Sequence, residues 1–291
     1  MIKPCCAITG SRGFVGRGLV SHFEAAGWRV RHLIRRPSPL VNQGLDARPF
    51  ILGEAVDPAI LAGVDLLIHC AHDFSELSWS GSRRVNVMGA EALFDAALRA
   101  GVKRQIFVSS MAAFEGCRSK YGLAKLACEE MTRVRGGAIV RPGVVVSDQE
   151  GGLAGTVAAF ARRFPVLPMI GAGNYPLYPC HLDDLCSLIL YMAEQSEHSV
   201  PLVTAAHSDP VTLRAIAMSA RLPARPPKIV PIPWPLVGFG LKLLEMIGLR
   251  PGFRSDSVIS IVHANPSPDF SILAKMPVPF RSPFPSISGK K

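Results

Sequence analysis

Three side chains in the middle of the chain are of the types that could carry out acid–base chemistry together. The stretch "FVSSMAAF" places Ser109 and Ser110 at the end of an apolar run, and "YGLAK" places Tyr121 and Lys125 four residues apart. Residues i and i+4 share one face of a helix, so the phenol and the ammonium can point into one site. A nearby positive charge favours the ionised form of a phenol, whose unperturbed pKa is about 10. Tyr121 could then exchange a proton with a substrate hydroxyl or carbonyl, while Ser110 hydrogen-bonds the same oxygen.

Apolar runs of strand length alternate with helical patterns through the first half of the chain. The strand-like runs include "PCCAITG", "WRVRHLIRR", "VDLLIHCA" and "RQIFVSSMA", and they are separated by amphipathic stretches such as "GRGLVSHFEAAG" and "NVMGAEALFDAALRAG". Continuous apolar strands are buried on both faces, and their alternation with helices is typical of parallel βαβ units. The sequence therefore predicts an α/β protein with a doubly wound parallel sheet, with Ser109 and Ser110 at the sheet edge that binds ligands.

A glycine-rich turn follows the first of these strands. Gly10, Gly13 and Gly16 in "TGSRGFVG" stand between a strand and a helix. Backbone N–H groups and the positive end of a helix can receive a pyrophosphate at such a turn. A tight turn without a ligand is the alternative for glycines alone, but the order of strand, glycines and helix favours a dinucleotide site. The nicotinamide would exchange a hydride while Tyr121 exchanges the proton.

The end of the second strand indicates which dinucleotide binds. An acidic residue about 20 positions beyond the glycines commonly binds the ribose hydroxyls of NAD, whereas an arginine accommodates the 2′-phosphate of NADP. No acidic residue occurs between Glu24 and Asp46, and the second strand ends in Arg35 and Arg36. We therefore expect NADP rather than NAD, the alternative being that both arginines simply face solvent.

Composition narrows the class of partner. The 291 residues are 48% hydrophobic and carry a net charge of +10, which suits a phosphorylated ligand. The arginines are dispersed and no aromatic residues interleave with them, so we do not expect nucleic acid. Seven cysteines form no CxxC pair and no Cys/His cluster, so we expect reduced thiols and no metal site. Gly10 and Arg12 interrupt the first apolar run, so we expect no signal peptide or transmembrane segment and a cytoplasmic protein.

The C-terminal part has a different composition. The last 91 residues hold 15 of the 25 prolines, which predicts a small cap of loops and short helices. We expect a dinucleotide-binding domain over residues 1–165 with return elements at about 180–205, and a substrate-binding region over 166–291. A helix is predicted near 235–247, packed on the cap or another subunit rather than on a membrane, although an apolar helix in a basic protein leaves the membrane open. The tail after Arg281 is expected to be disordered.

Together these motifs resemble those of the extended short-chain dehydrogenase/reductases, also called the NAD-dependent epimerase/dehydratase family, many of which act on nucleotide sugars. The resemblance covers most of residues 5–205 and depends on "TGSRGFVG", "LLIHCAH", "RVNVMGAEAL", "FVSSMAAF", "YGLAK", "IVRPGVVV" and "HLDDLCSLI". It implies a Rossmann-type fold with Ser110, Tyr121 and Lys125 as catalytic residues. The dinucleotide-binding residues expected from the motifs are Gly10, Ser11, Arg12, Gly13, Phe14, Val15, Gly16, Arg35, Arg36, Glu54, Cys70, Ala71, His72, Asn86, Ser109, Tyr121, Lys125, Pro142, Gly143, Val144 and Val145.

Some positions depart from the family's pattern or leave alternatives open. Sugar dehydratases of the family carry an acidic pair after the catalytic hydroxyl, where this chain has Met111 and Ala112, so a 4,6-dehydratase is disfavoured. Glu54 stands where the family has an aspartate beside the adenine, and a surface glutamate is the alternative. Arg162 and Arg163 could reach a nucleotide diphosphate or be solvated helix charges.

The resemblance implies a hydride-transfer enzyme acting on a nucleotide sugar, either an epimerase that retains its dinucleotide or a 4-ketoreductase that consumes NADPH. Arg35 and Arg36 favour the reductase, whereas the family's membership favours the epimerase. A non-catalytic NADP-binding sensor or assembly protein of the same fold is the alternative from another class. We expect a homodimer, with the helix in "NVMGAEALFDAALRAG" as the candidate interface.

Overall fold

A seven-stranded sheet forms the centre of the computed structural model, which describes residues 3–36, 44–147, 152–195, 201–219, 227–249 and 253–282. All six strand pairings in this sheet are parallel. The strands are β1 (Cys5–Thr9), β2 (Arg29–Ile34), β3 (Asp46–Pro49), β4 (Leu66–His69), β5 (Arg104–Val108), β6 (Ala138–Pro142) and β11 (Leu202–Ala205).

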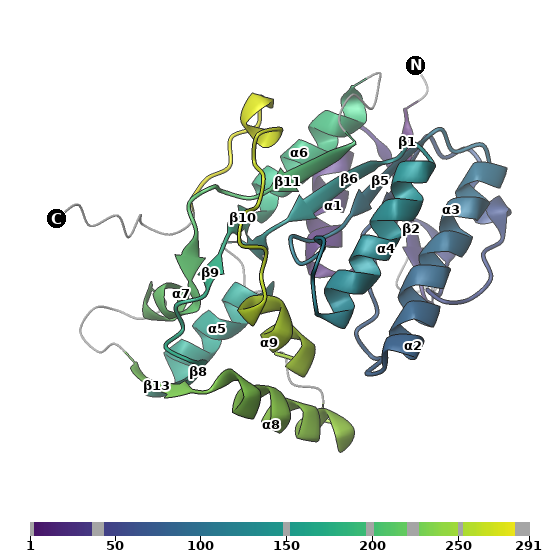
Figure 1. The fold of residues 1–291 in the computed structure, drawn as a ribbon. Helices are drawn as coiled ribbons and strands as arrows, with labels where there is room; N and C mark the ends of the chain where they lie inside the picture. The colour runs from purple at the N-terminus through teal and green to yellow at the C-terminus, as the bar shows by residue number, and fades with distance from the viewer. Residues whose placement is uncertain are drawn as a thin grey trace.

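The strand order is β11-β6-β5-β4-β1-β2-β3, so the chain first moves from β1 toward β3 and then returns to build the other half from β4 onward. Thr9, the last residue of β1, pairs with His69, the last residue of β4. The two carboxyl ends therefore lie side by side at the point where the strand order reverses, which is where open α/β sheets bind ligands. The predicted doubly wound parallel sheet is confirmed (Figure 1).

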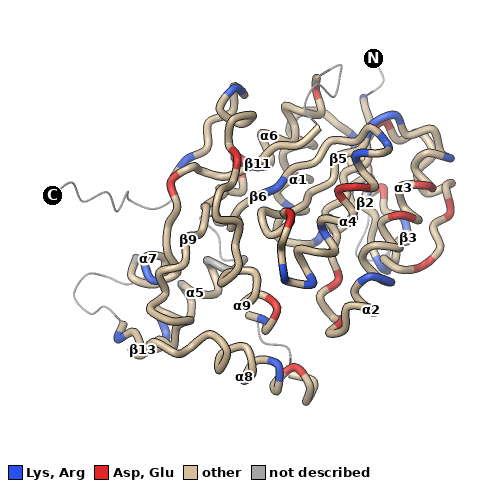
Figure 2. The backbone as a smooth tube through the Cα atoms, in the orientation of Figure 1, with Lys and Arg blue, Asp and Glu red and all other residues tan. Residues whose placement is uncertain are grey.

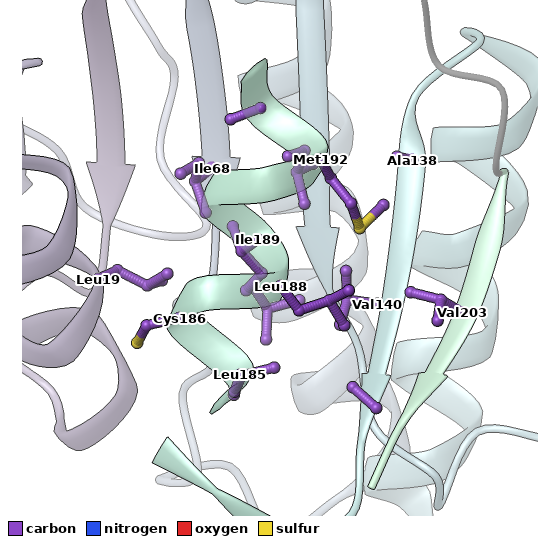
Figure 3. Packing of buried hydrophobic residues seen from close by; sticks show 14 of the residues in the cluster. Leu19, Ile68, Ala138, Val140, Leu185, Cys186, Leu188, Ile189, Met192 and Val203 are labelled. Atoms are coloured by element: carbon purple, nitrogen blue, oxygen red, sulfur yellow. The ribbon is translucent and has the colours of Figure 1, made fainter. Parts of the chain in front are cut away.

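Helices cover both faces of the sheet (Figure 1). Along β1, Cys6 and Ile8 belong to one apolar core and Cys5 and Ala7 to the other, because successive strand residues point to opposite faces. The first core packs against α1 (Phe14–Ala25) and α6 (Leu182–Glu194), and the second against α3 (Gly89–Arg99) and α4 (Lys120–Val134). Figure 3 shows the first core, where α6 packs beside Leu19 of α1 and the strands.

A smaller unit with its own apolar core, called the cap below, lies beyond the carboxyl edge of the sheet (Figure 1). It consists of α5 (Gly152–Arg163), β8 (Val166–Ile170), β9 (Pro176–Leu177), β12 (Val211–Thr212), α7 (Leu213–Ser219), β13 (Lys228–Ile232), α8 (Trp234–Met246) and α9 (Ser255–Val262). β13 pairs with β8 in parallel, and β12 pairs with β9 antiparallel. Between cap and sheet, β7 (Val144–Val146) pairs in parallel with β10 (Pro179–His181).

Four short helical segments complete the described chain: η1 (Pro58–Leu61), α2 (Trp79–Ser82), η2 (Arg83–Met88) and η3 (Leu273–Lys275). The helix predicted near 235–247 is α8, whose bounds are Trp234–Met246. No helix among the described residues is both long and apolar enough to cross a membrane. Residues 283–291, where disorder was expected, lie outside the described ranges.

Candidate functional site

The turn between β1 and α1 has the backbone geometry of an anion-binding loop. Gly10 has a φ of +66°, which side chains other than glycine rarely adopt. A Cβ at Gly16 would lie 2.1 Å from the carbonyl oxygen of Gly10, so only glycine allows the helix to start this close to the strand. Gly13 is the N-cap of α1 and offers no side chain to bind the first-turn N–H groups. These amides are therefore suited to an external anion such as a pyrophosphate.

Thr9, which directly precedes the glycine turn, connects this turn to the end of β4 through hydrogen bonds of its side chain. The hydroxyl of Thr9 contacts Nδ1 of His69 at 2.7 Å and accepts hydrogen bonds from the backbone N–H groups of Cys70 and Ala71 at 3.1 and 3.2 Å. Burial lowers the pKa of His69 to about 3, so its imidazole is neutral. Thr9 was not among the predicted site residues, although its position at the end of the first strand is the signal that points to it.

Asn86 acts on the loop after β4 through its side-chain amide. Its Oδ1 accepts from the N–H of Asp73 at 2.7 Å and its Nδ2 donates to the carbonyl of Asp73 at 2.9 Å. Asn86 is buried in the π-helical segment η2 and lines neither of the two cavities described below. It therefore fixes the loop that carries His72 and Phe74, and a π-helical turn is a frequent feature of functional sites.

The larger of two cavities follows the glycine turn and the ends of β2, β4 and β5, with a volume of about 750 Å³. The predicted residues that line it are Gly10, Arg12, Gly13, Phe14, Val15, Gly16, Arg35, Arg36, Cys70, Ala71, His72, Ser109, Ser110, Tyr121, Lys125, Pro142, Gly143 and Val145. This elongated set joins the anion-binding turn to the serine, tyrosine and lysine, and it fits a dinucleotide. Such a group would be held by the first-turn amides of α1 at its pyrophosphate.

Four predicted residues do not line this cavity. Val144 lines only the smaller cavity, and Asn86 acts from behind the loop. Ser11 is buried beside the turn, and its hydroxyl has no hydrogen-bond partner among the described residues. Glu54 is exposed and outside the cavity, whereas Phe50 and Leu52, which the motifs did not single out, line it. The adenine position expected for Glu54 is therefore bordered by apolar side chains of the preceding segment.

The two arginines at the end of β2 line the larger cavity and are exposed. Arg35 forms an ion pair with Asp73 of the loop after β4. Burial raises the pKa of Asp73, but hydrogen bonds from Ser75 and the charge of Arg35 outweigh burial and lower it overall. Arg31 of the same strand is instead buried against Asp46, at 2.8 Å, so only the last two arginines are placed to meet a ligand.

Capping fixes α4, the helix that carries Tyr121 and Lys125, at its N-terminus. The Ser119 hydroxyl accepts from the N–H of Gly122 at 3.0 Å. The carboxylate of Asp256 accepts from the N–H groups of Lys120 and Tyr121, both at 2.9 Å. A residue of α9 in the cap thus holds the first turn of α4, which places Tyr121 opposite Ser110 at the end of β5. Asp256 is distant in sequence, so no local pattern identified it.

The electrostatics of Tyr121 and Lys125 differ from the expectation that the ammonium would favour a phenolate. Burial raises the pKa of Tyr121, and a hydrogen bond with Ser110 only partly offsets this. Burial lowers the pKa of Lys125 to about 8. The ammonium donates to the carbonyl oxygen of Val108 at 2.7 Å and lies 5.9 Å from the centre of the Tyr121 ring. Tyr121 is therefore a protonated phenol at neutral pH, because desolvation raises its pKa by more than the hydrogen bond with Ser110 lowers it.

Aromatic rings from the loop after β4 surround Tyr121. The ring of His72 meets it edge-on with the centroids 4.8 Å apart, and the ring of Phe74 stacks on it at 5.5 Å. Burial, aided by the charge of Lys125, lowers the pKa of His72 well below its usual value, so this imidazole is neutral. The phenol is thus held between rings that limit its contact with water.

The side chain of Ser109 has a structural role, although this residue also borders the larger cavity. Its hydroxyl donates to the buried carboxylate of Glu129, which Arg141 binds through two hydrogen bonds of 2.8 and 2.6 Å. These hydrogen bonds link β5, α4 and β6. Ser110 is the serine whose side chain faces Tyr121.

A smaller cavity of about 470 Å³ lies between the sheet edge and the cap. Its apolar lining includes Phe14, Val15, Phe74, Leu77, Met111, Ala112, Val144, Leu177, Tyr178 and Ile261. The lining shared with the larger cavity consists of Phe14, Val15, His72, Asp73, Phe74, Ser110, Tyr121, Pro142, Gly143 and Val145. Tyr121 and Ser110 therefore stand where the two cavities adjoin.

The two cavities carry opposite charge. Among the described residues, the cations that line the larger cavity are Arg12, Arg35, Arg36 and Lys125, and its carboxylate is Asp73. The smaller cavity has the carboxylates Asp73, Glu76, Glu245 and Asp256, and the cations Lys120 and Arg254. Both of these cations have partners in the protein: Lys120 donates to the carbonyl of Leu77, and Arg254 lies 3.6 Å from Glu245.

Arg162 and Arg163, at the end of α5, are exposed and line neither of these cavities. Arg163 instead lies 5.7 Å from the ring centre of Phe164. Neither arginine is therefore placed to reach a nucleotide diphosphate in these two cavities.

Comparisons with known proteins agree with this geometry. The family model described as the NAD dependent epimerase/dehydratase family matches residues 6–203. A ceramide reductase of Caulobacter vibrioides is 36% identical over 171 residues, covering 56% of this chain and 53% of that protein. A 4-hydroxy-2-methyl-3-oxo-4-farnesyl-3,4-dihydroquinoline-1-oxide ketoreductase of Stigmatella aurantiaca is 28% identical over 217 residues, 65% of this chain and 64% of that protein. The alignments thus span about half to two thirds of these curated relatives.

Among solved structures, a UDP-glucose 4-epimerase of Thermus thermophilus in complex with NAD superposes with a TM-score of 0.61 at 20% sequence identity. The match covers 88% of this chain and 97% of that one. At this identity the likeness shows a shared fold.

Proposed function

We propose that this chain, which belongs to the NAD-dependent epimerase/dehydratase family, is an NADP-dependent ketoreductase. It would reduce a carbonyl carbon of a substrate that has a large apolar body. The observation that carries the proposal is the meeting of a cationic cavity and a largely apolar, acidic cavity at Ser110 and Tyr121. A nicotinamide dinucleotide, when bound, supplies the hydride.

The protonation of Tyr121 supports reduction. Reduction of a carbonyl adds a hydride to carbon and a proton to oxygen, and a phenol kept protonated by burial is suited to give that proton. Ser110 would hydrogen-bond the same oxygen and orient it. Lys125 would bind the dinucleotide and place a positive charge beside the site. An epimerase of the family would begin by removing a proton, which a phenol with a raised pKa does poorly.

The charge of the smaller cavity supports a substrate with an apolar body rather than a nucleotide diphosphate. A diphosphate needs an excess of cations around it, whereas the smaller cavity has four carboxylates and two cations, Lys120 and Arg254. Ceramide and farnesyl groups, after which the two relatives above are named, are long and apolar. The apolar lining would recover free energy by removing such chains from water.

A nucleotide-sugar epimerase or 4-ketoreductase is the second candidate. It is favoured by the fold shared with the Thermus thermophilus UDP-glucose 4-epimerase. The two candidates use the same Ser110, Tyr121 and Lys125 and differ in the occupant of the smaller cavity.

The test is a comparison of three substrates with the purified protein and NADPH. A ketone with a long alkyl chain, presented in detergent, is compared with a short analogue of the same ketone and with a UDP-4-ketohexose, and NADPH absorbance and product are followed. We expect turnover of the long-chain ketone with a lower KM than the short analogue. Turnover of the UDP-4-ketohexose alone would replace the proposal with the second candidate. Failure to bind either NADPH or NADH would end both the enzyme proposal and the alternative of a non-catalytic NADP-binding protein.

We also propose a homodimer, as expected from the sequence of α3. This helix buries Leu93, Phe94 and Ala97 against the sheet and leaves Leu98 exposed. Light scattering of the purified protein tests this directly.

A further inference from the structure

The helix α8 is apolar on two opposite sides. Trp234, Val237 and Leu241 pack into the core of the cap, and Glu245 is buried on the same side. These positions are three or four residues apart and so form one helical stripe. The large apolar residues that are exposed on the rest of α8 and just beyond it are Leu236, Phe239, Leu243, Leu244, Met246, Ile247 and Leu249, called the outer face below.

The outer face is unlike an ordinary helix surface. Lys242 is the one charged residue of α8 besides the buried Glu245, and Figure 2 shows charge colours only near the C-terminal end of this helix. Surface helices of globular proteins usually place charged and polar residues opposite their packed stripe, and a helix that is apolar all round is normally covered. Contiguous exposed apolar patches of this kind commonly mark protein or membrane interaction sites.

The sequence on either side of α8 is basic, and this charge identifies the partner. Over residues 214–254 the sequence has seven Lys or Arg residues and a single carboxylate. That carboxylate, Glu245, accepts from the N–H and hydroxyl of Ser255 at 2.9 and 2.7 Å and lies 3.6 Å from Arg254, so it is turned inward. An apolar helix face in a strongly basic segment is the combination that binds anionic lipid surfaces.

The length of the helix sets how it would meet a bilayer. α8 has 13 residues and is therefore about 20 Å long. A helix of about 20 residues is needed to span the hydrocarbon core, so α8 is suited to lie in the interface with its outer face in the lipid.

The cap wall that carries the outer face also borders the smaller cavity. Glu245 of α8 lines this cavity, and so do residues of α9, which packs directly on α8. In Figure 1, α8 forms the edge of the cap farthest from the sheet. The outer face and part of the wall of the smaller cavity thus belong to the same helix.

We propose that the outer face of α8 docks this protein on the surface of an anionic lipid bilayer. Docking would give a membrane-borne substrate access to the smaller cavity, and this role rests on the proposed function. The docking itself does not rest on it. Two features carry the proposal: the apolar outer face of α8 and the basic sequence in which this helix stands.

The test measures binding to lipid vesicles in the absence of substrate. Flotation with vesicles of phosphatidylcholine and phosphatidylglycerol is compared with flotation with phosphatidylcholine alone, for the full chain and for the double variant Phe239→Asn/Leu243→Asn. Phe239 and Leu243 are 69% and 52% exposed, so their replacement should leave folding intact. We expect binding to the anionic vesicles that weakens with salt and falls at least tenfold in the double variant.

The matched control is Leu45→Asn/Val134→Asn, which removes two apolar side chains that are 46% and 75% exposed, one just before β3 and one on α4. It should bind vesicles like the wild type. NADPH binding and the unfolding temperature establish that each variant is folded. In a third variant, Phe239→Trp, tryptophan emission should shift to the blue when anionic vesicles are added.

Three outcomes would overturn the proposal. The wild type could fail to float with anionic vesicles, or the control could lose as much binding as the α8 variant. The wild type could also form an oligomer in light scattering, without binding vesicles, that only the α8 variant dissociates. In that case a second copy of the chain, and not a lipid surface, would cover the outer face. Because no turnover is measured, failure of the docking proposal and failure of the reductase proposal are distinguishable.

Discussion

The two cavities adjoin at Tyr121 but carry opposite charge. Arg35 and Arg36 contribute to a cationic lining in the larger cavity, whereas carboxylates and apolar side chains border the smaller one. A polyanion and an apolar body can thus be bound side by side without competing for the same groups. The difference teaches that each cavity has a charge of its own, and that the net charge of the chain does not describe the substrate.

The largest effect is expected from Tyr121→Phe, because this residue belongs to both cavities. Loss of the proton donor should lower kcat by about 10²- to 10⁴-fold. NADPH binding, measured by fluorescence titration, should change less than about threefold, since a phenyl ring keeps the packing against His72 and Phe74. Tyr191→Phe on α6 is the control, and kcat that is equally retained in both variants would remove Tyr121 from the chemistry.

The next largest effect is a change of stability with pH that is caused by Lys125, a residue that borders the larger cavity only. Its native pKa is lowered to about 8 from 10.5, so between these values the unfolded chain still binds a proton that the native chain has lost. The free energy of unfolding therefore rises with pH in this window relative to Lys125→Met, by at most about 3 kcal/mol.

Urea unfolding of the wild type and of Lys125→Met at several pH values measures this difference. Lys120→Met is the control, because that ammonium is exposed on the same helix. A difference between wild type and Lys125→Met that stays constant with pH would contradict the desolvation of Lys125.

An intermediate effect is expected at the end of β2. Arg35→Ala/Arg36→Ala removes two cations from the larger cavity, and the loss of one hydrogen bond to a charged group costs about 1.5–3 kcal/mol. The KM for NADPH should rise about 10- to 100-fold, with little change for NADH or for the ketone. Steady-state kinetics with both dinucleotides measure this effect, and Arg29→Ala at the other end of the strand is the control. Equal losses for NADH and NADPH would argue against recognition of a 2′-phosphate.

The smallest effect is expected from Asp256→Asn, which borders the smaller cavity only. This change removes the negative charge at the N-terminus of α4 while keeping one acceptor oxygen, so it should lower stability by about 1 kcal/mol. Thermal unfolding measures the loss, and Asp269→Asn, an exposed turn residue that accepts from the N–H of Ser271, is the control. A larger loss in the control than in Asp256→Asn would show that α9 does not support α4.

Much of the sheet and of the glycine turn could be predicted, because these features depend on residues close in sequence. The alternation of apolar runs and helices identifies the parallel sheet, and the i, i+4 spacing of Tyr121 and Lys125 identifies a shared helix face. Asp256 could not be found in this way, since it caps α4 from a segment 135 residues beyond Tyr121. Glu54 was placed by resemblance, but the wall of the cavity is made by Phe50 and Leu52.

The sequence by itself determined the order of strands and helices, the glycines that permit a helix to start against a strand, and the supply of a serine, a tyrosine and a lysine. The tertiary structure decided the state of these groups. Desolvation keeps Tyr121 protonated and lowers the pKa of Lys125, and these shifts depend on atoms brought together from β4, β5 and α4. The fold also decided that the cations face one cavity and the carboxylates the other, because the charge of a cavity is set by which distant segments meet at its wall.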